Sequence, residues 1–548
     1  MAHTAAALGL TKPNVVEPLQ VSFAAIGIEP SDWEGDVLAV AVTEKDLCRS
    51  PCSSFENAVL KRLDSQLGGL LSEASAEEDF AGKAGQLVVL RLQGQGFKRL
   101  GLIGLGRSAP FTAAACRGLG ESFASVAKSA RAGSAALALA SPGGIHGEFK
   151  PNAAAAIASG TAIDLCRTVL GLYEDNRYRS ESNKVHLKHV HLIGFGYGPE
   201  VDRRLELANY VSSGVIFGKD LVNSPANVLT PVVLAEEASK IASTYSDVFT
   251  ATILDEERCR ELKMGSYLAV AAASANPPRF IHLCYKPPGG NVKRKLAIVG
   301  KGLTFDSGGY NIKIGAVCNI ELMKWDMGGS AAVLGAAKAL GEIKPPGVEV
   351  HFIVAACENM ISGTGMRPGD IVTASNGKTI EVDNTDAEGR LTLADALVYA
   401  CKQGVDKIID LATLTGFCRV ALGPSIAGIL TPSDELHEEV AAASEVSGEK
   451  FWRLPLEESY WETMKSGVAD MLNTGAIPQG GVITAALFLK QFVDEKVQWM
   501  HIDVAGPVWS HKNRSATGFG VSTMVEWVLK NSSSINEDEA TQGGEELV

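Results

Sequence analysis

Apolar runs of strand length alternate with alanine-rich runs of helix length along most of the chain. In the second half, four apolar runs span residues 295–300, 348–356, 407–413 and 497–504, and helix-length segments separate them at 330–340, 391–403 and 484–493. Strands that are apolar at nearly every position belong to sheets buried on both faces, and crossover helices connect parallel strands. The pattern therefore predicts an α/β fold with a mixed, mainly parallel sheet.

The first 200 residues repeat this alternation with shorter runs. Strand-length segments lie at 37–42, 86–92, 100–103 and 135–140, and helix-length segments lie at 113–130 and 153–172. A chain of 548 residues exceeds what one hydrophobic core usually serves. We therefore expect two domains, a smaller N-terminal α/β domain at 1–201 and a larger C-terminal α/β domain at 223–530.

The segments between and after these domains have a different character. Residues 202–222 have the spacing of an amphipathic helix, and the Pro/Asn turn at Asn223–Asn227 ends it. This helix is the predicted connection between the domains. Residues 531–548 are rich in Ser, Asn, Gly and Glu, which is typical of a disordered acidic tail.

Charge and composition exclude several classes of partner. The formal net charge of −13 offers no basic footprint to phosphates, so no nucleic acid partner is expected. No apolar run approaches the ~18 residues of a membrane span, so no membrane partner is expected either. The start of the chain shows no secretion signal. We expect a cytoplasmic protein, with the chloroplast stroma as the alternative if a transit peptide was removed.

A glycine-rich turn at 104–109 has the outline Gly-x-Gly-x-x-Ala of a dinucleotide-binding turn. The ribose-binding acid expected about 20 residues later is absent, because Glu121 falls inside the following helix-length run. A plain strand-to-helix turn is the favoured interpretation.

The densest polar cluster of the second half is the octapeptide Asn384–Leu391, which contains Asp386, Glu388 and Arg390. It lies between a predicted hairpin, whose turn is residues 375–377, and a helix-length run. The hairpin would place both acids just beyond a strand end, where open α/β sheets bind ligands.

A second acidic cluster precedes the octapeptide by about 80 residues and contains Lys301, Asp306, Lys313 and Asp326. Asp306 is expected in a glycine-rich loop after a strand. Asp326 stands at the entry to a helix, where by itself it would only complement the helix dipole. Four converging carboxylates would repel each other unless cations neutralised them. The two clusters together therefore predict a carboxylate-built dinuclear metal site suited to hydrolysis.

These segments resemble the leucyl aminopeptidase family, and in particular its plant-type members. The resemblance covers the catalytic half almost throughout and the N-terminal half only loosely. It implies a macro-like N-terminal domain and a dinuclear metal-dependent aminopeptidase that releases leucine and similar N-terminal residues from peptides and dipeptides. The matching segments are 299–309, 326–329, 384–391, 223–227, 412–416, 480–486 and 501–506.

Site roles follow from this resemblance position by position. It implies two ions, of zinc, manganese or magnesium, held by five ligands, Lys301, Asp306, Asp326, Asp386 and Glu388. Lys313 would polarise the scissile carbonyl, and Arg390 would hold a bicarbonate ion that acts as general base. The residues around the bicarbonate would be Ala387, Gly389 and Leu414, and those around the substrate Met323, Thr413, Ala505 and Lys313. The resemblance further implies a homohexamer, a dimer of trimers.

Two other functions remain open on the sequence alone. Some relatives bind DNA or behave as chaperones; the negative charge disfavours DNA, and a chaperone-like role stays a secondary possibility. A dinuclear phosphatase could use the same carboxylates, but the chain lacks the histidines that such sites often employ.

Overall fold

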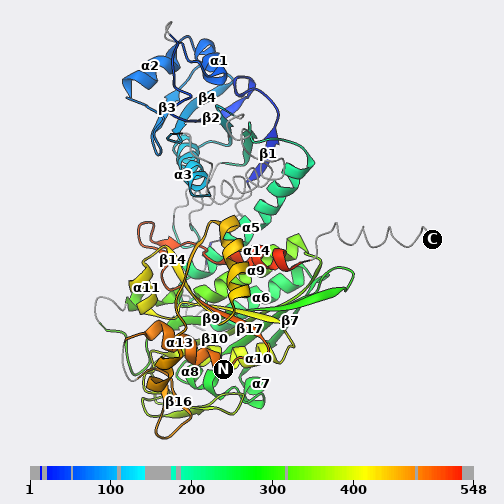
Figure 1. Cartoon of the computed structure of the whole chain (residues 1–548), viewed down its shortest axis with the longest axis vertical. Helices are drawn as coiled ribbons and strands as arrows, with labels where there is room; N and C mark the ends of the chain where they lie inside the picture. The colour runs from blue at the N-terminus through cyan, green and yellow to red at the C-terminus, as the bar shows by residue number, and fades with distance from the viewer. Residues whose placement is uncertain are drawn as a thin grey trace, which may run out of the picture. The chain divides into compact units, whose positions relative to one another are not determined.

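The structure is a computed structural model that describes residues 13–14, 21–50, 54–107, 113–141, 175–180, 187–314, 319–475 and 479–532. The chain forms two compact units (Figure 1). One contains Pro13–Ser212 and Val446–Gly448, and the other is built mainly from Ser213–Glu445 and Glu449–Val548. The division falls within helix α5 (Pro199–Asn223). The predicted helix at 153–172 and nearly all of the predicted tail lie outside the described residues.

The N-terminal unit is a six-stranded sheet covered on both faces. Its order is β1-β6-β5-β2-β4-β3, and only β3 runs antiparallel to its neighbour. Alternate residues of β2 enter two separate cores, one shared with α3 and the other with α1 and α2. The elements are β1 (Ser22–Ile26), β2 (Gly35–Val42), α1 (Ala58–Gln66), α2 (Leu70–Glu77), β3 (Leu87–Arg91), β4 (Phe97–Gly104), α3 (Ala113–Ala130), β5 (Ser134–Leu139) and β6 (His189–Ile193).

The larger unit contains an eight-stranded sheet in the order β15-β14-β17-β13-β9-β10-β8-β7. Its central strands β17, β13, β9 and β10 are parallel, and antiparallel pairs occur toward the edges. This confirms the predicted two-domain α/β architecture with a mixed, mainly parallel sheet. The strands are β7 (Phe249–Leu254), β8 (Arg279–Tyr285), β9 (Val292–Asp306), β10 (Gly347–Asn359), β13 (Lys407–Ala412), β14 (Ile426–Leu430), β15 (Lys450–Arg453) and β17 (Gln498–Asp503).

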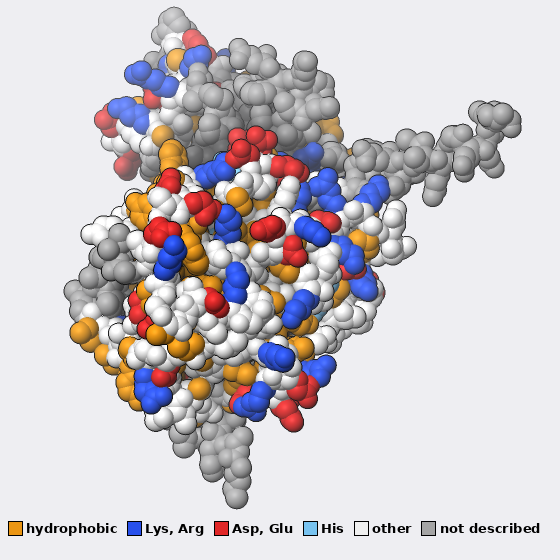
Figure 2. Space-filling model, turned by 60° about the horizontal axis from the view of Figure 1, so that its bottom comes forward, with side chains coloured by type: hydrophobic (Ala, Val, Ile, Leu, Met, Phe, Trp, Pro, Cys, Tyr) orange, Lys and Arg blue, Asp and Glu red, His pale blue; other side chains and the backbone are white. Residues whose placement is uncertain are grey.

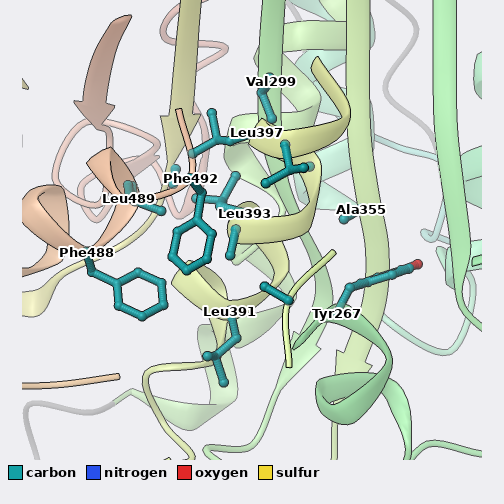
Figure 3. Packing of buried hydrophobic residues seen from close by; sticks show 14 of the residues in the cluster. Tyr267, Val299, Ala355, Leu391, Leu393, Leu397, Phe488, Leu489 and Phe492 are labelled. Carbon is teal, nitrogen blue, oxygen red and sulfur yellow. The ribbon is translucent and has the colours of Figure 1, made fainter. Parts of the chain in front are cut away.

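Helices cover both faces of this sheet. On one face, α10 packs between strands β9 and β10 and helices α8 and α13, through leucines of α10 and phenylalanines from α13 and the turn that follows it (Figure 3). Each such side chain contributes about 1.5–3 kcal/mol on burial. Helix α9 contacts the same strands but shares no residue with that cluster, so it covers the other face. These helices are α8 (Gly265–Ala271), α9 (Gly328–Ile343), α10 (Glu388–Cys401) and α13 (Gly481–Lys490).

The remaining elements of the larger unit are shorter or peripheral. The helices are α6 (Pro231–Thr244), α7 (Glu256–Glu261), α11 (Gly416–Leu422), α12 (Asp434–Ser447) and α14 (Val521–Asn531), with 3₁₀ turns η5 (Ile320–Trp325) and η6 (Glu458–Met464). The strands are β11 (Ile371–Thr373), β12 (Thr379–Glu381), β16 (Met471–Leu472), β18 (Trp509–Ser510) and β19 (Ser515–Ala516).

Two local predictions about the site segments were wrong. Strand β9 does not end at residue 300 but continues to Asp306, because β10 runs beside it to Asn359 with a bulge after Cys357. Lys301 therefore lies inside the strand, and Asp306, which was expected in a loop, is the last residue of the strand. The predicted hairpin is confirmed as β11 and β12, but β12 belongs to a small sheet with β16 and not to the main sheet.

The described part of the chain contains no helix long and apolar enough to cross a bilayer. On the face drawn in Figure 2, acidic and basic side chains are interspersed rather than separated into patches of one sign.

Candidate metal centre

The predicted site residues meet at the carboxyl ends of the central parallel strands, which is where open α/β sheets bind ligands. Strand β9 carries Lys301 and Asp306, and the turn after it carries Lys313. Asp326 lies between η5 and α9, and Glu388 is the first residue of α10. Thus one strand, two helix starts and their loops deliver one cluster of charged side chains.

Lys301 is the centre of one half of the cluster. Its Nζ lies 2.8 Å from Asp326 Oδ2 and 2.8 Å from Glu388 Oε1, and donates a hydrogen bond to the carbonyl of Thr413 at 3.0 Å. Thr413 Oγ1 donates to Asp326 Oδ1 at 2.9 Å. Asp326 makes no capping hydrogen bond to α9, so its contacts are with the cluster rather than with the helix start.

Lys313 holds the other half together. Its Nζ lies 2.7 Å from Asp306 Oδ2 and 2.6 Å from Asp386 Oδ1. The two ammonium groups thus face four carboxylates, of which Asp306, Asp326 and Glu388 are buried and Asp386 is partly exposed.

The donor set fits a divalent cation. Asp306, Asp386 and Glu388 each offer a carboxylate oxygen, and these oxygens lie within 4.8 Å of one another. Three buried oxygens of the cluster have no hydrogen-bond partner, Asp326 Oδ2, Asp386 Oδ1 and Glu388 Oε2, although the first two lie beside a lysine. The first two are therefore already neutralised by a cation, whereas Glu388 Oε2 is a buried charged atom without a partner, which is costly unless a cation binds it. Oxygen donors are also the ligands that magnesium and manganese prefer.

Burial and mutual repulsion perturb the protonation of the cluster. Burial, followed by repulsion from Asp306 and Glu388, raises the pKa of Asp386 to about 7. Burial likewise raises the pKa of Asp306 and Asp326. For Lys301, burial acts to lower the pKa, but the neighbouring carboxylates outweigh it and the net shift is upward. For Glu388, burial acts to raise the pKa, but the two lysines outweigh it and the net shift is downward, so the other three acids are the ones that resist ionisation and gain from added positive charge.

Three residues that the sequence did not single out fix the acids in place. Asn359 Nδ2, at the end of β10, donates to Asp306 Oδ1 at 2.8 Å and to the carbonyl of Thr385 at 3.0 Å. Asn311 Oδ1 accepts the Thr385 N–H at 2.9 Å, and Thr385 Oγ1 accepts the Asn311 N–H at 2.8 Å. Asn359 could have been noticed, because it follows a buried apolar run just as Asp306 does.

Arg390 is buried beside the acids and is held by a backbone contact. Its Nη1 donates to the carbonyl of Asn473 at 2.8 Å, whereas its Nε is buried without a hydrogen-bond partner. Burial lowers the pKa of the guanidinium to about 10, so the group remains charged at neutral pH. The side chain of Asn473 accepts the N–H groups of Asp383 and Asn384 at 3.0 and 3.2 Å. No sequence signal points to Asn473, because it lies in an irregular loop far along the chain.

The structure describes the local contacts of the other predicted positions. The N–H of Ala387 donates to the carbonyl of Asn384, and the N–H of Leu414 lies 3.3 Å from Asp503 Oδ1, so both donors are engaged within the protein. Met323 is half-buried on η5, three residues before Asp326. Ala505 is half-buried after β17, where its N–H donates to Asp503.

Comparison with known proteins gives consistent matches over nearly the whole chain. Residues 216–525 match the catalytic domain of the cytosol aminopeptidase family, and residues 40–182 match its N-terminal domain. A chloroplastic leucine aminopeptidase 2 of Oryza sativa subsp. japonica is 80% identical, covering 97% of this chain and 89% of that protein.

Leucine aminopeptidase 1 of Arabidopsis thaliana is 69% identical, covering 97% of this chain and 100% of that protein. Among solved structures, a lysine-to-glutamate mutant of tomato leucine aminopeptidase superposes with a TM-score of 0.88 at 60% identity, covering 96% of this chain and 99% of that one.

Proposed function

The chain belongs to the cytosol aminopeptidase family and is a metal-dependent leucyl aminopeptidase, and we propose that two divalent ions occupy the cluster around Lys301 and Lys313. The observation that carries this proposal is the convergence of the carboxylate oxygens of Asp306, Asp386 and Glu388 within 4.8 Å of one another, with Glu388 Oε2 buried and without a hydrogen-bond partner. Asp306 and Glu388 would bridge the ions, Asp386 would complete one site, and Lys301 and Asp326 would complete the other.

In the structure the two lysine ammonium groups stand where cations are expected, because each lies between two of the proposed ligands. As a ligand Lys301 must be neutral, so ion binding displaces the proton that Asp326 and Glu388 hold there. Zinc, manganese and magnesium all suit this donor set, with manganese and magnesium favoured by its oxygen atoms.

Bound ions supply an activated water and a Lewis acid for the scissile carbonyl. Lys313 is not needed as a ligand; an ion bound by Asp306 and Asp386 would take the place of its ammonium beside them, and the ammonium could then donate to the carbonyl oxygen as negative charge develops there. This explains why the chain places a second lysine 12 residues after the first at the same cluster.

Arg390 is proposed to hold a bicarbonate ion that serves as general base. Its unpartnered Nε offers a donor of the planar fork that such an anion fits. The Ala387 and Leu414 N–H groups already have acceptors, so within this set the guanidinium rather than those two amides supports the proposal. Gly389 packs directly against the end of the Lys301 side chain, so this position also has a structural role.

Met323, Thr413 and Ala505 are proposed to line the pocket for the first side chain of the peptide. A pocket of this kind separates residues that differ by one methylene by only about 1–3 kcal/mol, so leucine and methionine substrates should overlap. The proposed requirement for a free α-amine is tested by comparing leucyl anilide with its N-acetylated form. Equal cleavage of both would contradict an N-terminal mechanism.

Assembly and location are proposed from the family. A homohexamer, a dimer of trimers, is expected, and light scattering after gel filtration measures the mass directly. Several relatives are named chloroplastic, including those of rice and tomato, which supports the stromal alternative over the cytoplasm. Imaging a fluorescent fusion of the complete coding sequence in leaf cells distinguishes the two.

A further inference from the structure

A second group of metal-binding side chains lies far from the proposed active centre. Cys284 on β8 and Glu349 and His351 on β10 each offer one donor atom, and these atoms lie within 4.8 Å of one another. His351 is eight residues before Asn359 on the same strand, which corresponds to roughly 26 Å at the usual rise of a strand. The group is therefore separate from the cluster at the other end of β10.

We propose that Cys284, Glu349 and His351 bind one borderline divalent cation such as zinc. Strand pairing brings them together: His351 is directly opposite Cys284 in the antiparallel β8–β10 pair, and Glu349 precedes His351 by two residues and so shares its face. A thiol, an imidazole and a carboxylate suit zinc or cobalt, whereas manganese and magnesium prefer oxygen alone. Three protein ligands leave a fourth position for water.

The neighbouring side chains orient His351 as a ligand. Its Nδ1 lies 2.8 Å from His282 Nε2, and His282 Nδ1 lies 3.1 Å from Tyr399 Oη. A ligating imidazole normally has its other nitrogen fixed by such a partner. In one arrangement of the protons, His351 Nδ1–H donates to His282 Nε2, and His282 Nδ1–H donates to Tyr399 Oη. The lone pair of His351 Nε2 then faces Glu349 Oε1 at 3.0 Å. Two acceptors at that distance repel each other unless a proton or a metal ion lies between them.

Without a cation, the hydrogen bonds that connect these side chains can all point in the opposite direction. Tyr399 then donates to His282, His282 to His351, and His351 Nε2–H to Glu349. Cation binding reverses both imidazole tautomers without changing their charge and releases one proton, that of the Cys284 thiol.

The three ligands are shielded from solvent, and a positive charge competes with a cation for them. All three ligands are buried, with Cys284 the most accessible at 9% exposure. Lys295 Nζ lies 3.3 Å from Glu349 Oε1, but its side chain is 42% exposed and can turn into solvent when a cation binds. Lys286 also contributes positive potential near His351. A tetrahedral zinc site needs donor separations of about 3.3–3.8 Å, so small side-chain movements from the present spacing suffice.

Cobalt binding to full-length protein tests the proposal, because a cobalt–thiolate bond gives a charge-transfer absorption that oxygen ligands do not. After chelator treatment, cobalt should produce this band and saturate it at one thiolate-bound ion per chain. Cys284→Ser should abolish the band and His351→Ala should weaken binding at least tenfold, and excess manganese should not displace the ion. Aminopeptidase activity should persist in Cys284→Ser, which shows that the variant is folded.

Cys357→Ser is the matched control, since Cys357 is a buried cysteine of β10 nearer the active centre. The band should persist in this variant. Absence of the band in the wild type, or its persistence in Cys284→Ser, would overturn the proposal. If Cys284→Ser fails to fold, alkylation of the wild type decides: zinc should slow modification of Cys284 at least tenfold and leave Cys401 unchanged, and equal rates with and without zinc would refute the site.

Discussion

The close approach of Gly389 to Lys301 makes Gly389→Ala a sharp test of how the active centre is built. A Cβ at position 389 would lie 2.5 Å from Lys301 Cε and 2.7 Å from its Nζ. Carbon atoms in contact sit about 3.5–4.0 Å apart. Either the lysine retreats by roughly 1 Å or helix α10 moves.

Retreat of the lysine costs less than movement of the helix, because the clashing atoms are the end of a flexible side chain. Overpacking of this kind costs about 1–3 kcal/mol. The lysine Nζ would, however, leave Asp326 and Glu388, both 2.8 Å away. A misplacement of about 1 Å can reduce the rate on the order of 100-fold. We therefore expect kcat/KM for leucyl anilide to fall about 100-fold while the protein stays folded.

Gly363→Ala is the matched control, because nothing lies within 4 Å of a Cβ at that position. Its activity and thermal unfolding should equal those of the wild type. Wild-type kcat/KM in Gly389→Ala would refute the inference that Lys301 must be positioned against this glycine. Loss of activity in parallel with loss of folded protein would show a packing defect instead.

Three further perturbations probe separate parts of the account. Asn473→Ala leaves the buried N–H groups of residues 383 and 384 without an acceptor. The free energy of unfolding should therefore fall by about 1–3 kcal/mol, and the affinity for metal should fall as well; calorimetry measures both. Lys313→Met should lower kcat about 100-fold with both ions still bound, because its ammonium is proposed to act on the carbonyl and not on the metals. Burial raises the pKa of Asp395 to about 6, so its contribution to stability is present below about pH 4 and is lost as pH rises through 6. Urea unfolding of Asp395→Asn should lack this decrease of up to about 3 kcal/mol, whereas an identical pH slope would contradict it.

The sheet was predictable because its central strands are buried on both faces. The apolar runs at 348–356 and 407–413 correspond closely to β10 and β13. The end of β9 was missed because Lys301, Thr304 and Asp306 interrupt its apolar run, whereas pairing with β10 keeps these residues in the strand. Local composition marks where a strand is apolar, but pairing decides how long it is.

The types of site residue could be predicted, but their contacts could not. The order β13-β9-β10 brings Thr413, Lys301 and Asn359 to one edge of the sheet, and that order is not visible in a single sequence. Asn473 supports the octapeptide from an irregular loop about 85 residues later, without any recognisable motif. The sequence motif identified both lysines as site residues. That each lysine pairs with different acids appears only in the three-dimensional structure.

The central claim is that this carboxylate and lysine cluster binds two ions and that activity depends on both. Manganese titration of chelator-treated protein tests it most directly, because manganese disfavours the thiol-containing site and reports on the oxygen-rich centre alone. The account predicts that hydrolysis of leucyl anilide recovers fully at two bound manganese ions per chain, and that Asp386→Ala loses one of them together with activity. Full recovery at one ion per chain, or unchanged binding of two ions by Asp386→Ala, would contradict it.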